Sequence, residues 1–191
     1  MSNRIGLYGG SFDPFHLGHF IGAQDALEQV KLDELIFIPC AQSPHKPNQE
    51  PTSAHHRLRM IQVAIRGYGG FSVSDCEIKR GAPSFAIDTV HYFKEQRPRS
   101  QFFWLIGLDQ LILLRTWKDY ELLRKLITFV VMERPGSKRA APRRGVIYLP
   151  QPRLIAISST EIRNRVKKQQ MIDHLVPALV ARYIDQHSLY R

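Results

Sequence analysis

The sequence is poor in the features that mark several broad classes of protein. It holds two cysteines, Cys40 and Cys76, which are too few for a disulfide framework and match no zinc-ligand spacing. We expect both to be buried thiols in a reducing cytoplasm. No apolar run approaches the roughly 18 residues that a membrane-spanning helix needs. The first residues also show no apolar stretch followed by a small-residue cleavage site, so we expect a cytoplasmic protein.

Acidic residues are scarce too, and the deficit leaves the chain strongly basic. There are 27 Lys and Arg against 17 Asp and Glu, a formal charge of +10. Excess positive charge favours anionic partners, which include nucleic acid, membrane head groups and nucleotide phosphates. Part of the charge is concentrated in the Pro- and Gly-rich stretch 137–145, which we expect to be a loop. A solvated basic loop explains this charge without any partner, so the role of the stretch stays open.

What the chain does have is enough apolar material for a proper core. Hydrophobic residues make up 43% of the 191 residues, which excludes disorder as the main state. The length fits one domain. We therefore predict a single domain over 1–191, with a C-terminal helical part at about 158–191 packed on it.

Strand-type and helix-type patterns alternate along the chain. The strand patterns, mostly short apolar runs typical of strands buried on both faces, cover 5–8, 35–38, 71–74, 102–106, 127–132 and 146–149, with one more extended piece at 154–157. The helix patterns cover about 20–30, 54–66, 87–97 and 122–126, and a last helix starts at Pro177. This alternation predicts an α/β fold: a doubly wound, mostly parallel sheet with helices on both faces. A ligand would then lie outside the carboxyl ends of the strands.

The loop after the first strand, from Gly9 to His19, has the composition of a phosphate site. Gly9 and Gly10 allow close approach of the backbone to a ligand. The next helix would start near 15–17, so its N–H groups and positive dipole end face the same place. His16 and His19 would project from one face of that helix. The spacing is neither a dinucleotide fingerprint nor a P-loop. A metal-binding histidine pair, which lacks a recognisable third ligand, and a structural turn are the alternatives.

Three further places carry chemistry, and each has a structural alternative. Asp109 directly follows the 102–106 strand, where a carboxylate can accept the hydroxyls of a ribose or can cap a helix. Trp117 fits a position in the core. The run Ser158-Ser159-Thr160 begins a helix, with Arg163 beyond it. Such a start is a common cap, and followed by an arginine it is also typical of a triphosphate-binding helix end.

The segment Gly9–His19 resembles the signature of the nucleotidyltransferase superfamily with the His-x-Gly-His motif, and 157–163 resembles its second signature. Between them, four motifs are similar to those of the bacterial nicotinate mononucleotide adenylyltransferases, in order and at similar intervals: Ser43-Pro44-His45-Lys46, Gly107-Leu108-Asp109, Trp117 and Arg134-Pro135-Gly136. The resemblance spans Arg4 to about Arg165. It implies a Rossmann-like nucleotidyltransferase fold.

The resemblance also implies a reaction. ATP and nicotinate mononucleotide would give nicotinate adenine dinucleotide and pyrophosphate, a late step in NAD synthesis. The 5′-phosphate of the mononucleotide would attack the α-phosphorus of ATP in line, without a covalent enzyme intermediate. Catalysis would rest on positioning and on stabilising charge at the phosphoryl oxygens. Mg²⁺ would be carried on the triphosphate, and no metal ligands are assigned to the protein.

Residue roles follow from the same resemblance. His16 and His19 would be the catalytic residues, as donors to the ATP phosphates, although the sequence does not tell their protonation state. Lys46 would bring positive charge to the phosphates, unless it is an ordinary surface lysine, and Trp117 would stack on the pyridine ring. The implied ATP-binding residues are Gly9, Gly10, Ser11, Phe12, His16, His19, Gly107, Asp109, Ser158, Ser159, Thr160 and Arg163. The implied mononucleotide-binding residues are Ser11, Lys46, Ser84, Phe85, Ala86, Trp117 and Arg134.

Departures from the family pattern leave the acceptor open to alternatives. The family often has Thr where Ser11 stands, and commonly has Tyr-Thr where this chain has Phe85-Ala86. If the pyridine carboxylate is bound by backbone N–H groups, preference for nicotinate over nicotinamide survives these changes. The alternatives are a relative acting on nicotinamide mononucleotide or phosphopantetheine, and a basic nucleic-acid-binding protein. A nucleic-acid-binding protein would carry a module signature, or exposed aromatic residues interleaved with basic ones, and the sequence shows neither. We expect no nucleic-acid or membrane partner, and oligomeric state leaves no signal in the sequence.

Overall fold

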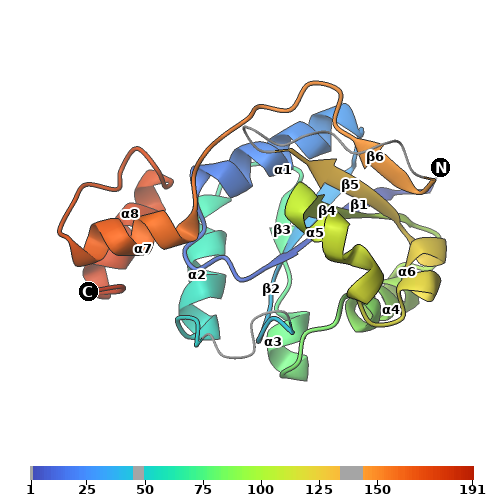
Figure 1. Cartoon of the computed structure of the whole chain (residues 1–191), viewed down its shortest axis with the longest axis horizontal. Helices are drawn as coiled ribbons and strands as arrows, with labels where there is room; N and C mark the ends of the chain where they lie inside the picture. The colour runs from blue at the N-terminus through green and yellow to red at the C-terminus, as the bar shows by residue number, and fades with distance from the viewer. Residues whose placement is uncertain (1, 45–49, 134–143) are drawn as a thin grey trace.

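A computed structural model of the chain describes residues 2–44, 50–133 and 144–191. Within these ranges, six strands form one sheet in the order β3-β2-β1-β4-β5-β6 (Figure 1). Every neighbouring pair is parallel, so the sheet is parallel throughout rather than mostly so. The strands are β1 (Arg4–Gly10), β2 (Glu34–Pro39), β3 (Phe71–Val73), β4 (Gln101–Gly107), β5 (Thr128–Met132) and β6 (Val146–Tyr148).

Helices follow the strands in the alternation that the sequence predicts. The helix that begins at Ala86 ends at Gln96, because Pro98 disfavours helical geometry at Arg97, the residue before it. The helices of the described residues are α1 (Leu17–Gln29), α2 (Ala54–Ala64), α3 (Cys76–Arg80), α4 (Ala86–Gln96), α5 (Leu108–Leu113), the 3-10 turn η1 (Leu114–Thr116), α6 (Tyr120–Leu126), α7 (Ser159–Lys167) and α8 (Ala178–Gln186).

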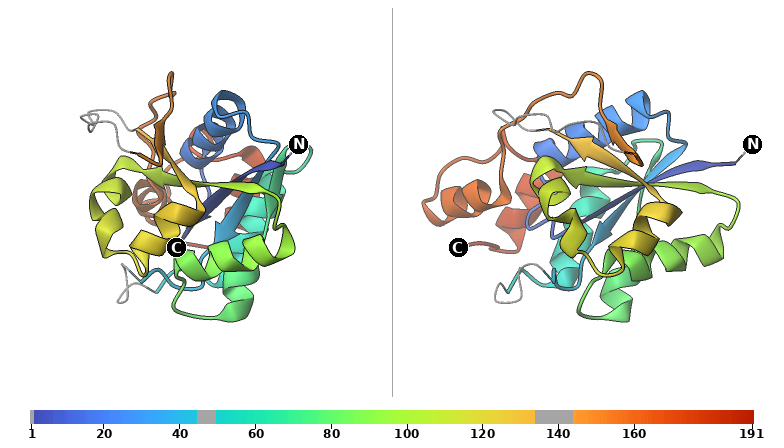
Figure 2. Two further views of the ribbon diagram at one scale, coloured as in Figure 1. Left: turned by 90° about the vertical axis from the view of Figure 1, so that its right-hand side faces the viewer. Right: turned by 45° about the vertical axis from the view of Figure 1, so that its right-hand side comes forward.

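The two faces of the sheet are covered by different helices, seen from two further directions in Figure 2. One core layer holds buried residues of α1, α2 and α8, and the other holds those of α4, α5 and α6. The residues of β4 alternate between them: Phe103 and Leu105 face the first layer, and Phe102, Trp104 and Ile106 face the second. A strand buried on both faces is apolar at every position, which explains the unbroken apolar run at 102–106. The predicted doubly wound α/β fold is confirmed.

Three details differ from the predicted elements. The short helices α3 and α5 have five and six residues, too few for a helical period to stand out in the sequence. The predicted extended piece at 154–157 is not a strand, because the chain leaves the sheet after β6 and runs along α1. Arg153 and Gln151 tie this segment to Asp25 and Gln29 of α1.

The C-terminal helices lie at one end of the molecule, opposite the N-terminus (Figure 1). Val180 and Ile184 of α8 belong to the core layer that also holds Met60 and Ile61 of α2. Further on, the Tyr190 hydroxyl donates a 2.7 Å hydrogen bond to Asp13 in the loop after β1. The end of the chain is thereby attached to the predicted phosphate loop. None of the helices in the described ranges is both long and apolar enough to cross a membrane.

Candidate active site

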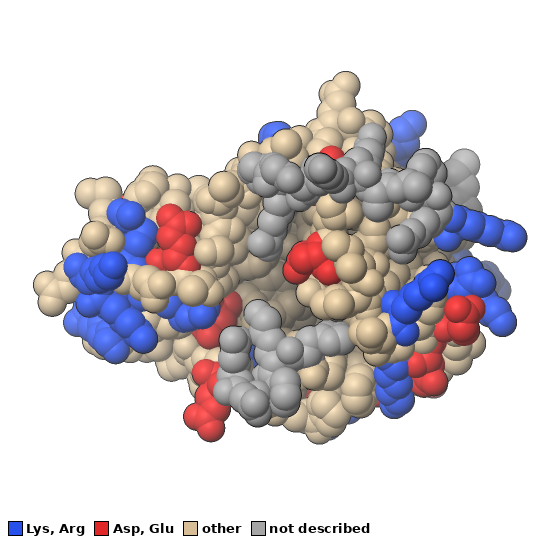
Figure 3. Space-filling view, in the orientation of Figure 1, with Lys and Arg blue, Asp and Glu red and all other residues tan. Residues whose placement is uncertain are grey.

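The predicted site residues gather where the strand order reverses. β1 lies between β2 and β4, and β1 and β4 end at Gly10 and Gly107. Figure 3 shows this face of the molecule hollowed near its centre, with acidic side chains at the rim and Lys and Arg gathered toward the two ends. The carboxyl ends of the strands are where ligands bind in folds of this kind.

His16 and His19 cap the helix that follows the first strand. His16 is the N-cap of α1, its Nδ1 accepts from the His19 N–H at 3.3 Å, and His19 Nδ1 accepts from the His16 N–H at 3.3 Å. Their rings stack with centroids 3.6 Å apart, so they share one face as predicted. Because each Nδ1 accepts a backbone hydrogen bond, each neutral ring carries its proton on Nε2. In the neutral state, the remaining donor of each ring is therefore its Nε2–H.

The glycines before this pair are required by packing as well. A Cβ at Gly9 would lie 2.9 Å from the Trp104 ring, and one at Gly10 would lie 3.1 Å from the Phe12 ring. Phe12 is itself buried at 2% exposure and has a φ of +50°, a left-handed conformation that is strained for a bulky residue. Its side chain packs in the core, so only its backbone is available to a ligand.

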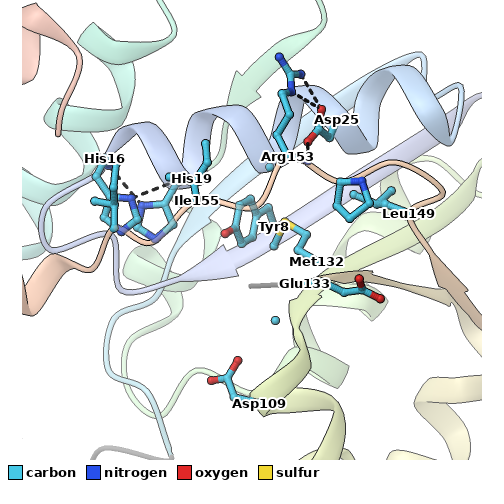
Figure 4. Close-up of a pocket in the computed structure, with 15 residues that line it drawn as sticks. Tyr8, His16, His19, Asp25, Asp109, Met132, Glu133, Leu149, Arg153 and Ile155 are labelled. Atoms are coloured by element: carbon cyan, nitrogen blue, oxygen red, sulfur yellow. Dashed lines mark hydrogen bonds and ion pairs between the residues drawn. The ribbon is translucent and has the colours of Figure 1, made fainter. Parts of the chain in front are cut away.

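A first cavity lies at this point of the sheet, and its lining includes Tyr8, the histidine pair and Asp109. The close-up in Figure 4 shows Asp109 at the start of α5, across the cavity from Tyr8 and the histidine pair. The alternative in which Asp109 is a helix N-cap is wrong, because the N-cap of α5 is Gly107. A Cβ at Gly107 would collide with Asp109 Oδ1, so the glycine makes room for the carboxylate. Asp109 is exposed, and its carboxylate is placed to accept hydroxyl donors.

The second signature is attached to the first by hydrogen bonds. Ser158 caps α7 by accepting from the Glu161 N–H at 3.1 Å, so the predicted cap is confirmed. Ser159 Oγ donates to the Pro14 carbonyl at 3.0 Å, and Arg163 donates to the Asp13 carbonyl at 2.7 Å. Arg163 also contacts Thr160 Oγ1 at 3.2 Å. These contacts bring the start of α7 beside the phosphate loop, 145 or more residues away in the chain.

A second cavity adjoins the first. Tyr8 and His19 line both, so the two cavities meet at the histidine pair. Trp117 is half-buried, with its ring edge-on to Trp104 at 6.3 Å between centroids. It borders the second cavity and also packs against the core. The sequence-predicted residues that line this cavity are Gly9, Gly10, Ser11, Phe12, His19, Ser84, Phe85, Ala86 and Trp117.

The start of α4 forms one wall of the second cavity. Phe85 is its N-cap, and no side-chain cap is found there within the described residues. The Ser84 hydroxyl accepts from the Ala41 N–H at 3.0 Å, and so serves the fold. The first N–H groups of a helix have no intrahelical partner and carry its positive dipole end. Lys118 Nζ lies 4.7 Å from the centre of the Phe85 ring and pairs with the Asp88 carboxylate of α4 at 3.4 Å.

Two predicted contacts, Lys46 and Arg134, lie outside the described residues, as does most of the basic 137–145 stretch.

Comparison with known proteins shows the family of the chain. Residues 7–165 match the model of the cytidylyltransferase-like family. The chain belongs to that family.

Its curated relatives are alike over their full length. A "Probable nicotinate-nucleotide adenylyltransferase" of Methylacidiphilum infernorum (isolate V4) is 45% identical over 189 residues, covering 99% of this chain and 93% of that protein. A protein of the same name from Opitutus terrae is 44% identical over 195 residues, covering 98% of each. The nucleotidyltransferase resemblance seen in the sequence is confirmed.

A solved structure supports the fold of this cytidylyltransferase-like chain. The Plasmodium falciparum nicotinic acid mononucleotide adenylyltransferase complexed with NaAD matches with a TM-score of 0.81. The identity is 23%, over 98% of this chain and 97% of that one. The match extends the shared architecture to nearly every residue of both chains.

Sequence patterns miss two buried charged residues of this nucleotidyltransferase, Arg57 and Glu77. Glu77 lies in the wall of the second cavity at 3% exposure and accepts from Thr89 Oγ1 at 2.6 Å. Burial raises the pKa of its carboxyl, and hydrogen bonds from Thr89 and Ser84 oppose that rise. Arg57 did leave a signal: it precedes Met60 and Ile61 by three and four residues, on the apolar face of the predicted helix.

Cys40 also borders the second cavity, on the segment after β2. Both cysteines are buried free thiols, as expected. Burial raises the pKa of the Cys40 thiol, although Ser11 and Arg57 act in the opposite direction. A thiol held protonated is a weak nucleophile, so Cys40 shapes the cavity rather than reacting.

Proposed function

We propose that the protein transfers the adenylyl group of ATP to nicotinate mononucleotide, giving nicotinate adenine dinucleotide and pyrophosphate. The observation that carries this proposal is the pair of adjoining cavities that meet at His19. Such an arrangement suits two nucleotides whose phosphates must come together. The names of the curated relatives support the same activity, and family membership favours an enzyme over the nucleic-acid-binding alternative.

ATP would occupy the first cavity. The Asp109 carboxylate would accept the hydroxyls of its ribose, and the Nε2–H groups of His16 and His19 would donate to its phosphates. The hydroxyl-bearing start of α7, with Thr160 and Arg163, would border the triphosphate. These donors are fixed before substrate arrives, because the capping contacts already orient them.

Nicotinate mononucleotide would occupy the second cavity. Its pyridine ring would stack on Trp117, and its carboxylate would lie at the start of α4. Recognition there would use backbone N–H groups, which would keep a preference for the acid although Phe85 and Ala86 carry no hydroxyl. Ser11 borders this cavity beside the histidine pair, where the two phosphates would meet.

The chemistry is then an in-line displacement. An oxygen of the mononucleotide phosphate forms a bond to the α-phosphorus of ATP as the bond to the bridging oxygen of pyrophosphate breaks. The histidine donors would stabilise the charge that spreads over the α-phosphoryl oxygens. Because the reacting phosphate is already an anion, no general base is needed to activate it.

Mg²⁺ would accompany ATP. Over the part of the chain that the structure describes, no three His, Cys, Asp or Glu side chains are arranged to hold a metal ion. The donors present therefore fit an ion that takes most ligands from the triphosphate and water, as Mg²⁺ usually does. When bound it would neutralise charge on the phosphates. Given the unpaired cysteines, we also propose that the protein works in the cytoplasm.

The test is pyrophosphate release from Mg-ATP with nicotinate mononucleotide and nicotinamide mononucleotide offered in parallel. Strong release with the acid alone is expected. Comparable release with both would retain the enzyme class and overturn the proposed specificity of α4. Release with neither would overturn the proposed acceptor and direct attention to another phosphate-bearing one, such as phosphopantetheine.

A further inference from the structure

Arg57 is the most deeply buried charged side chain near the site. It lies in the first turns of α2 and is 1% exposed. Among the described residues it forms no ion pair, and its four side-chain hydrogen bonds all go to main-chain carbonyls. Burying a charge is costly unless its donors are satisfied. Its position is therefore set by the carbonyls that surround it.

Those carbonyls belong to three different segments. Nε donates to the Thr52 carbonyl at 2.8 Å, just before α2. One terminal nitrogen donates both to the Ser11 carbonyl at 2.9 Å and to the Cys40 carbonyl at 2.8 Å. The other donates to the Ala41 carbonyl at 3.3 Å. One guanidinium thus joins the loop after β1, the segment after β2 and the start of α2.

Two of these segments meet the substrates in the proposed function. Ser11 and His19 both border the second cavity. The segment after β2 reaches the start of α4, because the Ala41 N–H donates to Ser84 Oγ at 3.0 Å. The Gln42 carbonyl also accepts from the Ser84 N–H at 3.1 Å. Arg57 is therefore connected to the phosphate loop directly and to the proposed carboxylate site through one intermediate segment.

We propose that Arg57 is a positioning residue of the transfer reaction, which sets the phosphate loop at Ser11 in register with the cavity for the mononucleotide. This inference rests on the proposed function. Arginine suits the role because its planar group offers five donors in a rigid fork. Lysine would keep the charge, but its single nitrogen cannot span the same carbonyls. The charge also lies behind the phosphate loop, where it favours anionic substrates.

The geometry predicts an asymmetric effect. Asp109 and α5, which would hold the adenosine part of ATP, follow β4, and none of the Arg57 hydrogen bonds reaches them. Loss of the fork should therefore disturb mononucleotide binding and the alignment of the phosphates. It should change the KM for ATP less, because Asp109 and α5 keep their positions.

The experiment compares Arg57→Lys and Arg57→Gln with wild type, using Arg59→Lys as the matched control. Arg59 is exposed on the same helix and donates a side-chain hydrogen bond to Gln62. In steady-state assays of the purified enzyme, Arg57→Lys is expected to lower kcat roughly 10- to 100-fold, the usual result of a small misalignment of reacting groups. The KM for the mononucleotide should rise by a larger factor than the KM for ATP. Arg59→Lys should behave as wild type.

A double-mutant cycle with Ser11→Ala supplies a readout that a purely structural role would not move. If Arg57 acts through the loop at Ser11, the two losses in kcat/KM overlap, and the double variant loses less than their product. The proposal would be overturned if the two losses in kcat/KM were independent, or if both KM values changed equally. It would also be overturned if Arg57→Lys had the kinetic constants of wild type, or if neither Arg57 variant folded. Failure of the proposed function is distinguishable, because it would show as an inactive wild type.

Discussion

The two cavities of the site are built in different ways. At the first, the reciprocal His16–His19 cap orients two side chains of the wall, and the bonds from Ser159 and Arg163 hold the start of α7 beside the loop 9–19. The second is formed by a packed aromatic ring, Trp117, and by the start of α4. The first thus fixes directions for donors, as phosphate chemistry requires. The second fixes a shape, which in the proposed function would select the acceptor.

This difference explains why the reaction class is easier to infer than the acceptor. Directed donors depend on a few residue types at set spacings, whereas a shaped cavity depends on packing from several elements. The four predictions that follow test the contrast, beginning with the largest expected effect.

Replacing His16 or His19 by alanine should nearly abolish turnover. Loss of one preorganised donor to a phosphoryl group costs roughly 10²- to 10³-fold in kcat. Loss of the cap should cost only about 1 kcal/mol of stability. Turnover and thermal unfolding should be measured together, with His91→Ala on the exposed side of α4 as control. A double variant with normal activity would contradict the assignment of the first cavity.

Asp109→Asn should raise the KM for ATP roughly 10- to 100-fold, because hydrogen bonds to a charged group contribute about 1.5–3 kcal/mol. The KM for the mononucleotide should change little, since Asp109 does not line the second cavity. The exposed Asp173→Asn is the control. Equal increases in both KM values would remove the distinction between the two cavities.

Trp117→Ala should weaken the binding of the mononucleotide rather than that of ATP. Stacking of a base on an aromatic side chain contributes about 1–3 kcal/mol, so the KM for the mononucleotide should rise roughly tenfold. The KM for ATP should stay near the wild-type value. Trp117→Phe keeps a ring and should recover most of the affinity. An unchanged mononucleotide KM in the alanine variant would return Trp117 to a role in the core alone.

Tyr190→Phe should have the smallest effect on turnover and a clear one on stability. It removes the hydroxyl that donates to Asp13 at 2.7 Å, and a buried acceptor that loses its donor costs about 1–3 kcal/mol. Thermal unfolding should shift down, while turnover changes only a few-fold. Tyr68→Phe, at an exposed residue, is the control. A loss of turnover as large as that of the histidine variants would mean that the C-terminus takes a direct part in the phosphate site.

Sequence reasoning succeeded where a feature lies in one contiguous stretch. The loop 9–19, the buried run 102–106 and the serine-rich start of α7 could each be read without knowledge of their neighbours. Sequence reasoning was incomplete where the choice between two interpretations depended on the residues that pack beside the side chain in the fold. Asp109 could not be separated from a cap until Gly107 was seen to take that place, and Trp117 proved to combine packing with a position at the cavity.

The sequence by itself determined the family and the alternating architecture, because motifs at set spacings and hydrophobic periodicity encode these directly. Only the tertiary structure decided how the two signatures join, which tautomer the histidines hold, and that Arg57 connects three segments. The physical reason is that the partners in these contacts are largely main-chain groups. Every residue carries the same carbonyl and N–H, so no sequence pattern marks the ones that the fold brings together.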